Sequence, residues 1–212
     1  MTGPSLHRPR RDAFEASSLE VAPRLLGGLL RHTTAQGAVA LRITEVEAYI
    51  GDGLDPGSHA FRGRTKRNAV MYGPPGHLYA YFTYGMHVCA NVVCSPEGEA
   101  TAVLLRAAEV VEGEALAEHR RIGASGRSIP HRDLARGPAR LVVAAGISLA
   151  DDGADLYGGR FELLLPDEPL PHATGPRTGV SGAGGGAAFP WRYWLPGDPT
   201  VSPYKRHPKA SD

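Results

Sequence analysis

Hydrophobic residues alternate with polar or small ones in several short segments of the chain, which is the pattern of half-buried β-strands. The longest such segment covers 38–50, in which Val39, Leu41 and Ile43 recur with a period of two. Shorter segments with strand character are 77–83, 87–94, 101–107 and 160–165. We expect the first two of these to be the arms of a hairpin, since Tyr84-Gly85 between them suits a tight strand reversal.

Helical character is found in three segments: 19–32, 108–122, which would end at Gly123, and part of 134–145. Glycine commonly ends a helix, and the Gly27-Gly28 pair weakens the first of these segments. Strands followed by mixed helices favour an α+β sheet over a repeating βαβ array. We therefore predict an α+β fold: a single compact domain with a curved, mostly antiparallel sheet, flanking helices and a protruding β-hairpin.

The domain is expected to span 17–204, between a flexible N-terminal tail, 1–16, and a flexible C-terminal tail, 205–212. The first residues contain arginine and proline but no apolar core or small-residue cleavage site, so they do not read as a secretory signal. The glycine-rich tract 179–186 resembles a linker, but several aromatic residues that need burial follow it. We therefore expect it to be an internal loop.

No apolar run approaches the roughly 20 residues that a membrane-spanning helix needs, so no membrane partner is expected. The chain has two cysteines, Cys89 and Cys94. On one extended strand they would be roughly 16 Å apart, too far for a disulfide. A reducing cytoplasmic setting fits this pattern best.

Positive charge is concentrated in two segments, although the net charge is only +1. Segment 62–67 holds four basic residues and no acid, and 120–140 holds six arginines against the single acid Asp133. If both segments share a face, they would supply contacts to phosphates. The alternative is that they are ordinary solvated loops.

Aromatic residues are concentrated in 76–87, which contains three tyrosines and a phenylalanine although aromatics make up 7% of the chain. One interpretation is that these rings fill the core under a sheet. The other is a rigid wedge that stacks against, or inserts between, the bases of a nucleic acid.

Continuing the period of two from Ile43 places Glu45, Glu47 and Tyr49 on the apolar face of the strand. A carboxylate among apolar groups has a raised pKa, which suits a general acid or base near neutral pH. Alternatively, both acids are solvated or paired with arginines where the strand leaves the core, or a bulge changes the register.

Paired acids also suggest glycoside hydrolysis, but carboxylates two residues apart on one strand face point in parallel and do not straddle a substrate. One of the two acids is therefore expected to carry the chemistry. A zinc site is a further alternative, although the spacing of the histidines and cysteines matches no ligand pattern. We expect no metal and no cofactor.

Several ordered blocks of the sequence match a known family. They are ITEVEAYI (43–50), SHA (58–60), TKRN (65–68), YAYFTYGM (79–86), LLRAAE (104–109), GPARL (137–141) and RTGV (177–180), with Met71, Pro75-Gly76, Asn91 and the region 191–202. The chain resembles the alkyladenine (3-methyladenine) DNA glycosylases over nearly all of 19–202. Ordered blocks are far more specific than any one short motif.

The resemblance implies a monofunctional base-excision-repair enzyme without a lyase step. It would flip alkylated or deaminated purines out of duplex DNA and hydrolyse the N-glycosidic bond, leaving an abasic site. Its substrates would be 3-methyladenine and, as further candidates, hypoxanthine and ethenoadenine. The implied partner is double-stranded DNA containing damaged purines, bound by a monomer in the cytoplasm or at the nucleoid.

The resemblance also implies roles for individual residues. Glu47 would activate the water that attacks C1′, helped by Arg106 and the backbone carbonyl of Thr178. Tyr84 would intercalate and fill the gap left by the flipped nucleotide. The implied base pocket is Tyr49, His59, Tyr81, Asn91 and Leu104, with Asn91 disfavouring the amino group of guanine. The implied DNA-binding residues are Thr65, Arg67, Met71, Met86, His87 and Arg140.

Two other function classes stay open from the sequence. One is a non-catalytic module that wedges into distorted, damaged duplexes. The other is a structural or small-molecule-binding domain. The chain departs from the family pattern at His87, where relatives can carry tyrosine, and in the glycine-rich run 184–186.

Overall fold

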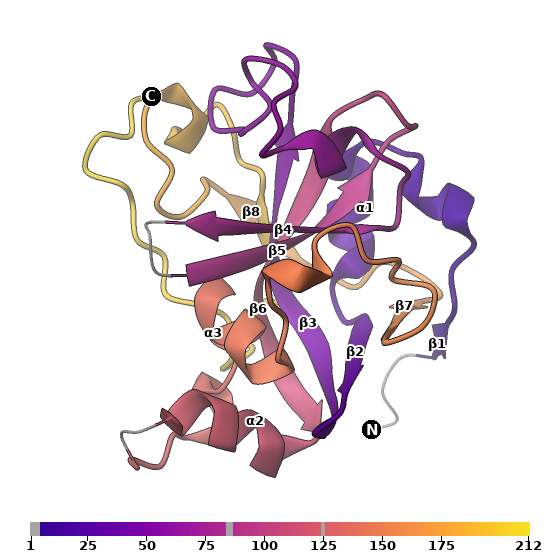
Figure 1. Cartoon of the computed structure of the whole chain (residues 1–212). Helices are drawn as coiled ribbons and strands as arrows, with labels where there is room; N and C mark the ends of the chain where they lie inside the picture. Colours follow the sequence, from indigo (N-terminus) through magenta and orange to yellow (C-terminus); the bar gives the residue numbers. More distant parts are fainter. Residues whose placement is uncertain (1–4, 84–86, 124–125) are drawn as a thin grey trace.

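The chain folds around one large antiparallel sheet (Figure 1). The structure, a computed structural model, describes residues 5–83, 87–123 and 126–212. The described strands are β1 Leu6–His7, β2 Leu29–Thr34, β3 Gly37–Ile50, β4 Leu78–Thr83, β5 His87–Cys94, β6 Thr101–Glu112, β7 Phe161–Pro166, β8 Ala173–Gly175 and β9 Arg192–Trp194. Their order is β1-β7-β2-β3-β6-β5-β4, and β9 pairs with both β3 and β8.

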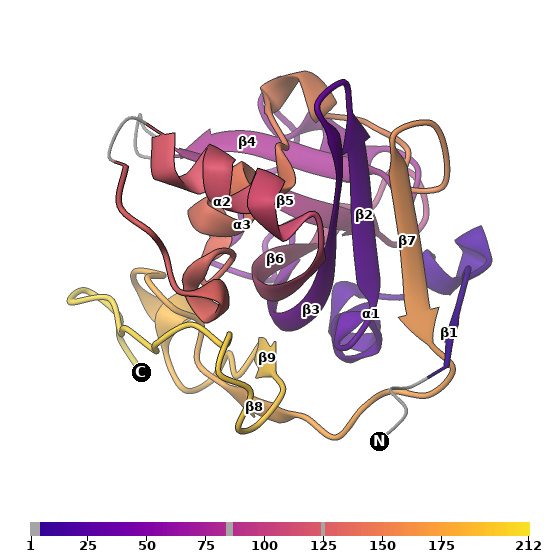
Figure 2. The same ribbon diagram turned by 90° about the horizontal axis from the view of Figure 1, so that it is seen from below.

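Helices flank this sheet, which confirms the predicted α+β class. The described α-helices are α1 Ser18–Leu25, α2 Glu114–Ile122 and α3 Pro138–Ala145, and the short 3-10 turns are η1 Arg11–Phe14, η2 Ala69–Tyr72, η4 His131–Asp133, η5 Leu149–Asp151 and η6 Ala183–Gly185. Helix α1 packs against β3, α3 packs against β5 and β6, and α2 packs on α3 (Figure 2). Of the described helices, none is long and apolar enough to cross a membrane.

The predicted helix over 19–32 is wrong in its second half. Helix α1 ends at Leu25, and 29–34 form β2, which lies between β3 and β7. Gly27 has a positive φ of 79° and its N–H donates to the carbonyl of Ile43, so the chain leaves the helix and enters the sheet here. Strand pairing with distant segments overrides the local helical pattern.

The predicted helix over 108–122 begins too early. Strand β6 continues to Glu112, because 108–112 pair with the first half of β3. Gly113, with a φ of 75°, then turns the chain into α2. The other predicted strands match observed strands within a few residues.

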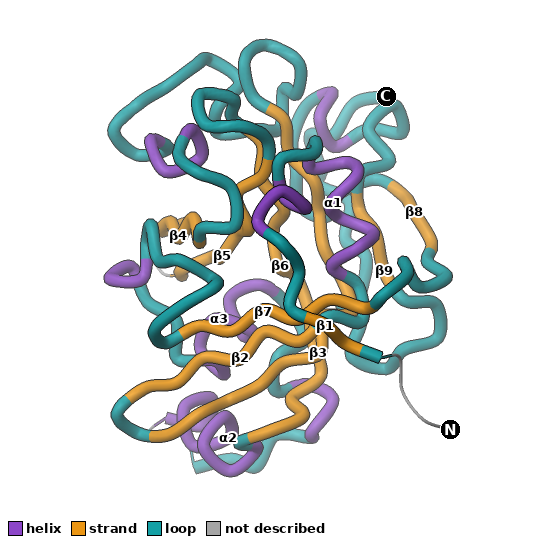
Figure 3. Tube along the Cα trace, turned by 90° about the vertical axis from the view of Figure 1, so that its right-hand side faces the viewer, coloured by secondary structure: helices purple, strands orange, loops and turns teal. Residues whose placement is uncertain are grey.

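Both terminal segments contact the body of the protein where they are described. In Figure 3, β1 lies beside β7 at one end of the row that continues through β2 to β3. Phe14, which the sequence analysis places in the N-terminal tail, is fully buried in the main core. Near the other end, the N–H of Gly182 donates to the carbonyl of Lys209. The boundaries 17–204 of an independent domain stay a prediction.

Candidate active site

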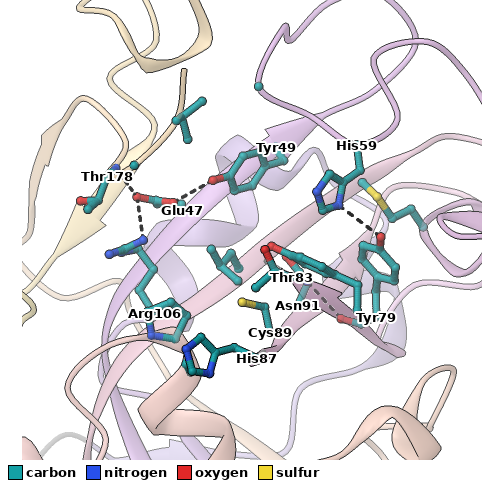
Figure 4. A pocket seen from close by; sticks show the side chains of 18 of the residues that line it. Glu47, Tyr49, His59, Tyr79, Thr83, His87, Cys89, Asn91, Arg106 and Thr178 are labelled. Atoms are coloured by element: carbon teal, nitrogen blue, oxygen red, sulfur yellow. Dashed lines mark hydrogen bonds and ion pairs between the residues drawn. The ribbon is translucent and has the colours of Figure 1, made fainter. Parts of the chain in front are cut away.

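A cavity of about 470 Å³ opens over the face of β3, β6, β5 and β4. Its lining includes every predicted catalytic and base-pocket residue: Glu47, Arg106, Thr178, Tyr49, His59, Tyr81, Asn91 and Leu104. Met71 and His87 also line it. Figure 4 shows Glu47 between Thr178, Arg106 and Tyr49, with the rings of His59 and Tyr79 on the opposite side. The predicted intercalating residue Tyr84 and the predicted DNA contact Met86 lie outside the described residues.

The sheet itself builds the floor of this cavity. Glu47 pairs with Leu104, Leu104 with Asn91, and Asn91 with Tyr79, so these residues form one row across β3, β6, β5 and β4. Residues two positions further along each strand point to the same face. This explains why Tyr81 and Cys89, which also pair, line the cavity too.

A bulge in β3 directs Glu47 into the cavity. The expectation that Glu47 shares a face with Val39, Leu41 and Ile43 is wrong, because the pairing with β6 is irregular between Ile43 and Val46. After the irregularity, Val46 and Ala48 continue the row of core residues that begins with Val39. An extra residue in one strand re-aims the side chains that follow it. Glu47 and Tyr49 therefore face the cavity instead of the core.

The carboxylate of Glu47 is fully buried and held at both oxygens. Its Oε1 accepts the N–H of Thr178 at 2.7 Å and lies 3.3 Å from Nη1 of Arg106. Its Oε2 accepts the hydroxyl of Tyr49 at 2.8 Å. Burial, together with the charge of Glu47, raises the pKa of Tyr49 well above its usual value, so this phenol stays protonated and donates.

Arg106, which contacts Glu47, is also bound by the neighbouring acid Glu45. Glu45 Oε1 accepts Nε–H of Arg106 at 2.8 Å and Nε–H of Arg192 at 2.6 Å, and its Oε2 accepts the N–H of Ser202 at 2.7 Å. Burial raises the pKa of Glu45, but attraction to Arg106 and Arg192 outweighs it and holds the pKa below its usual value. Both acids are thus buried among arginines, which corrects the expectation of apolar surroundings.

Aromatic rings form the wall opposite Glu47. Tyr79 and Tyr81 stack with their centroids 5.3 Å apart, and His59 packs edge-on against Tyr81 at 4.4 Å. Tyr79 belongs to a small hydrophobic cluster separate from the main core. The amide of Asn91 donates to the carbonyl of Tyr79 at 3.0 Å. The rings of Tyr79 and Tyr81 therefore do both: they pack in or against this core cluster, and they line the cavity.

Three predicted DNA-binding residues lie outside the lining of the cavity. Thr65, Arg67 and Arg140 are exposed, and none of them lines the cavity. Arg67 donates to the carbonyl of Phe82 at 3.1 Å, and its guanidinium lies 5.7 Å from the ring centroid of Tyr81. Met71 is only 2% exposed, so it faces the cavity and not the open surface.

The sequence analysis missed several residues of the site. Tyr79 and Cys89 could have been found from strand parity, because each lies two positions from a predicted pocket residue on the same strand. The rim residues Pro138 and Ala139 at the start of α3 had no such signal. Cys89 and Cys94 are both free thiols, as expected.

Comparisons with known proteins identify the family of the chain. The model of the family "Methylpurine-DNA glycosylase (MPG)" matches residues 12–199. A protein of Leifsonia xyli subsp. xyli named "Putative 3-methyladenine DNA glycosylase" is 80% identical over 206 residues, covering 97% of each chain. Proteins of the same name from Streptomyces avermitilis and Nocardia farcinica are 54% and 50% identical, covering 93% and 89% of this chain and 92% and 88% of their own. The chain therefore belongs to the methylpurine-DNA glycosylase family, as its sequence blocks indicate.

Proposed function

We propose that this protein removes 3-methyladenine, and also hypoxanthine and ethenoadenine, from duplex DNA by flipping the base and hydrolysing its N-glycosidic bond. The family and its named relatives support the coarser part of this statement, a DNA glycosylase of repair that hydrolyses N-glycosyl bonds. The finer part of the proposal covers the three lesions and the flipping of the base. It also includes a monomer that acts on DNA in the cytoplasm and has no lyase step. The observation that carries the proposal is Glu47, a fully buried carboxylate on the floor of a ring-lined cavity.

Glu47 is arranged to act as a general base. Each carboxylate oxygen can accept two hydrogen bonds, so Oε2 keeps an acceptor site beside the bond from Tyr49. A water bound there would lose a proton to Glu47 as its oxygen bonds to C1′. The base would leave with the electron pair of the glycosidic bond, and an abasic site would remain. Arg106 would hold the carboxylate in place for this step.

The rings of the cavity can offset the cost of base flipping. A glycosylase cannot reach its target in a stacked duplex, and flipping costs a few kcal/mol. Stacking contributes about 1–3 kcal/mol per base, so Tyr49 and Tyr81 can supply energy of this size. The π-faces also attract alkylated purines that carry positive charge.

His59 fits a cationic substrate as well. The residue is exposed at the cavity, but its ring packs against Tyr81 and lies 3.3 Å from the hydroxyl of Tyr79. Loss of solvent around the ring, helped by the charge of Arg67, lowers the pKa of His59. A neutral imidazole would not repel a positively charged base.

The function is tested by two substrates. DNA treated with a methylating agent should release 3-methyladenine, detected by chromatography of the freed bases. A duplex with one hypoxanthine should yield a shortened strand only after alkali treatment, because a monofunctional enzyme leaves an intact abasic strand. Absence of base release from both substrates would refute the proposal, and strand cleavage without alkali would refute monofunctional action.

Replacing Tyr84 with alanine tests the intercalating role that the family resemblance implies for it. We expect affinity for a lesion duplex and the excision rate to fall about 10- to 100-fold, in line with the loss of one ring stacked on the bases. Titration of a fluorescent duplex and single-turnover kinetics measure the two quantities. Tyr204→Ala, which removes an exposed tyrosine that does not line the cavity, serves as the control. Unchanged affinity in Tyr84→Ala would rule out the wedge.

A further inference from the structure

Arg177 is a charged side chain with no exposure, and it lies directly behind the wall of the cavity. Its Nη1 and Nη2 donate to the two carboxylate oxygens of Asp55, each at 2.6 Å. Nη1 also donates to the carbonyl of Ala48 at 2.9 Å, and Nη2 to that of Gly184 at 2.7 Å. One guanidinium thus joins β3, the loop that follows it and the glycine-rich loop.

Arg177 supports the pocket residue Tyr49 from behind. The carbon at the centre of its guanidinium lies 4.4 Å from the ring centroid of Tyr49. The same group lies 5.2 Å from the ring centroid of Trp191 and 5.8 Å from that of Phe189, so Tyr49 is one of several aromatic neighbours. Because the hydroxyl of Tyr49 also donates to Glu47, the ring is fixed both at its face and at its tip.

Arg177 also fixes the donor that holds Glu47. The next residue is Thr178, whose N–H donates to Glu47 Oε1 at 2.7 Å. A shift of the Arg177 side chain relative to Asp55 would therefore move this donor. Neither Arg177 nor Asp55 lines the cavity, so neither can touch a flipped base directly.

Two glycines make room for this arrangement. A Cβ at Gly57 would lie 2.6 Å from Nη2 of Arg177, and a Cβ at Gly184 would lie 2.5 Å from the backbone nitrogen of Gly57. Asp55 additionally accepts the N–H of Gly57 at 2.8 Å. These close approaches explain the glycine at 184, because a side chain there would separate the two loops.

A role in stability alone does not account for this ion pair. Desolvation offsets much of the attraction between buried charges, and well-packed apolar residues often stabilise as well or better. Only a planar guanidinium can bind a carboxylate with two bonds, reach two carbonyls and stack on a ring at once. The geometry therefore points to orientation of neighbouring groups.

We propose that Arg177 and Asp55 are positioning residues, which act through Tyr49 and Thr178 to align the stacking ring and the general base of the same site. This inference deepens the proposed function and rests on it. Misplacement of reacting groups by about 1 Å can cost on the order of 100-fold in rate. The pair should therefore govern the excision step more than the binding of DNA.

The test compares Asp55→Asn and Arg177→Lys with the wild type. Two quantities are measured for each protein. The first is the single-turnover rate of hypoxanthine excision at saturating enzyme. The second is the affinity for a duplex that carries a tetrahydrofuran abasic analogue, which has no base to stack. We expect the rate to fall on the order of 10- to 100-fold and the affinity for the analogue to stay within twofold. Asp151→Asn is the matched control, because Asp151 is 2% exposed, pairs with Arg160 and does not line the cavity.

The outcomes separate this inference from the proposed function. Absence of excision by the wild type on every lesion would refute the function itself. With an active wild type, rates within twofold of it in both variants would overturn the positioning role. An equal loss of affinity for the analogue would overturn it too, because the whole DNA-binding surface would then have changed. If Asp55→Asn does not fold, the excision rate of Arg177→Lys alone tests the positioning role. If neither variant folds, the ion pair serves folding and the positioning role is overturned.

Discussion

Glu47→Gln is expected to lower the single-turnover rate of base excision by about 10²- to 10⁴-fold, the usual contribution of a general base. Glutamine has nearly the same shape but cannot take a proton from water. The amide oxygen of glutamine can still accept the N–H of Thr178, and its NH2 group can donate to the hydroxyl oxygen of Tyr49, so the cavity should keep its form. Affinity for a lesion duplex should therefore stay within a few-fold of the wild type.

The measurement is alkali-dependent cleavage of a hypoxanthine duplex, with binding followed separately by fluorescence anisotropy. Glu109→Gln is a suitable control, because Glu109 pairs with Arg42 and does not line the cavity. Retained excision in Glu47→Gln would exclude Glu47 as the base. An inactive wild type that still binds lesions would favour the alternative of a non-catalytic damage-binding module.

Glu45→Gln is expected to destabilise the protein by about 3–5 kcal/mol at pH 7, because it removes the charge of the buried carboxylate that Arg106 and Arg192 share. Arg106 and Arg192 are only 8% and 6% exposed, so water cannot replace Glu45 as their partner. A loss of this size is a large share of the 5–15 kcal/mol that stabilises a typical protein. Urea denaturation of both proteins gives the difference in unfolding free energy.

The effect of Glu45→Gln should depend on pH in a defined direction. The pKa of Glu45 is held below its ordinary value of 4.5 in the folded protein. The stabilisation by ionised Glu45 is therefore complete above pH 4.5 and is lost as the pH falls through the lower, folded-state pKa. The two proteins should converge in stability under acid conditions. A constant difference from pH 7 to pH 3 would contradict this account, and Glu112→Gln in an exposed pair should change little at any pH.

Sequence patterns could predict those parts of the fold that depend on local alternation. The hairpin strands and β3 follow directly from a period of two. Strand β2 and the last part of β6 could not be predicted in this way, since their conformation depends on pairing with distant strands, as in Leu29 with Leu164. The bulge in β3 has the same origin, because alternation alone does not reveal where an extra residue enters a ladder.

The residues of the candidate site also fall into a group that the sequence indicated and a group that it did not. Family blocks indicated Glu47, Tyr49 and Tyr81, and the structure brings these residues to one cavity. The ion pairs that hold them had no local signal. Arg177 lies 122 residues from Asp55, and Arg192 lies 147 residues from Glu45. No motif or periodicity connects partners at such separations.

The bond from Thr178 to Glu47 spans 131 residues, and this separation has a consequence for protein synthesis. Domains emerge from the ribosome N-terminal end first. Strand β3 leaves long before Thr178, so a nascent chain or a prematurely terminated product holds the acid without the amide that orients it. The two segments can meet only after Thr178 has been synthesised, so an unfinished copy that lacks Thr178 cannot form this bond or complete the wall of the cavity around Glu47.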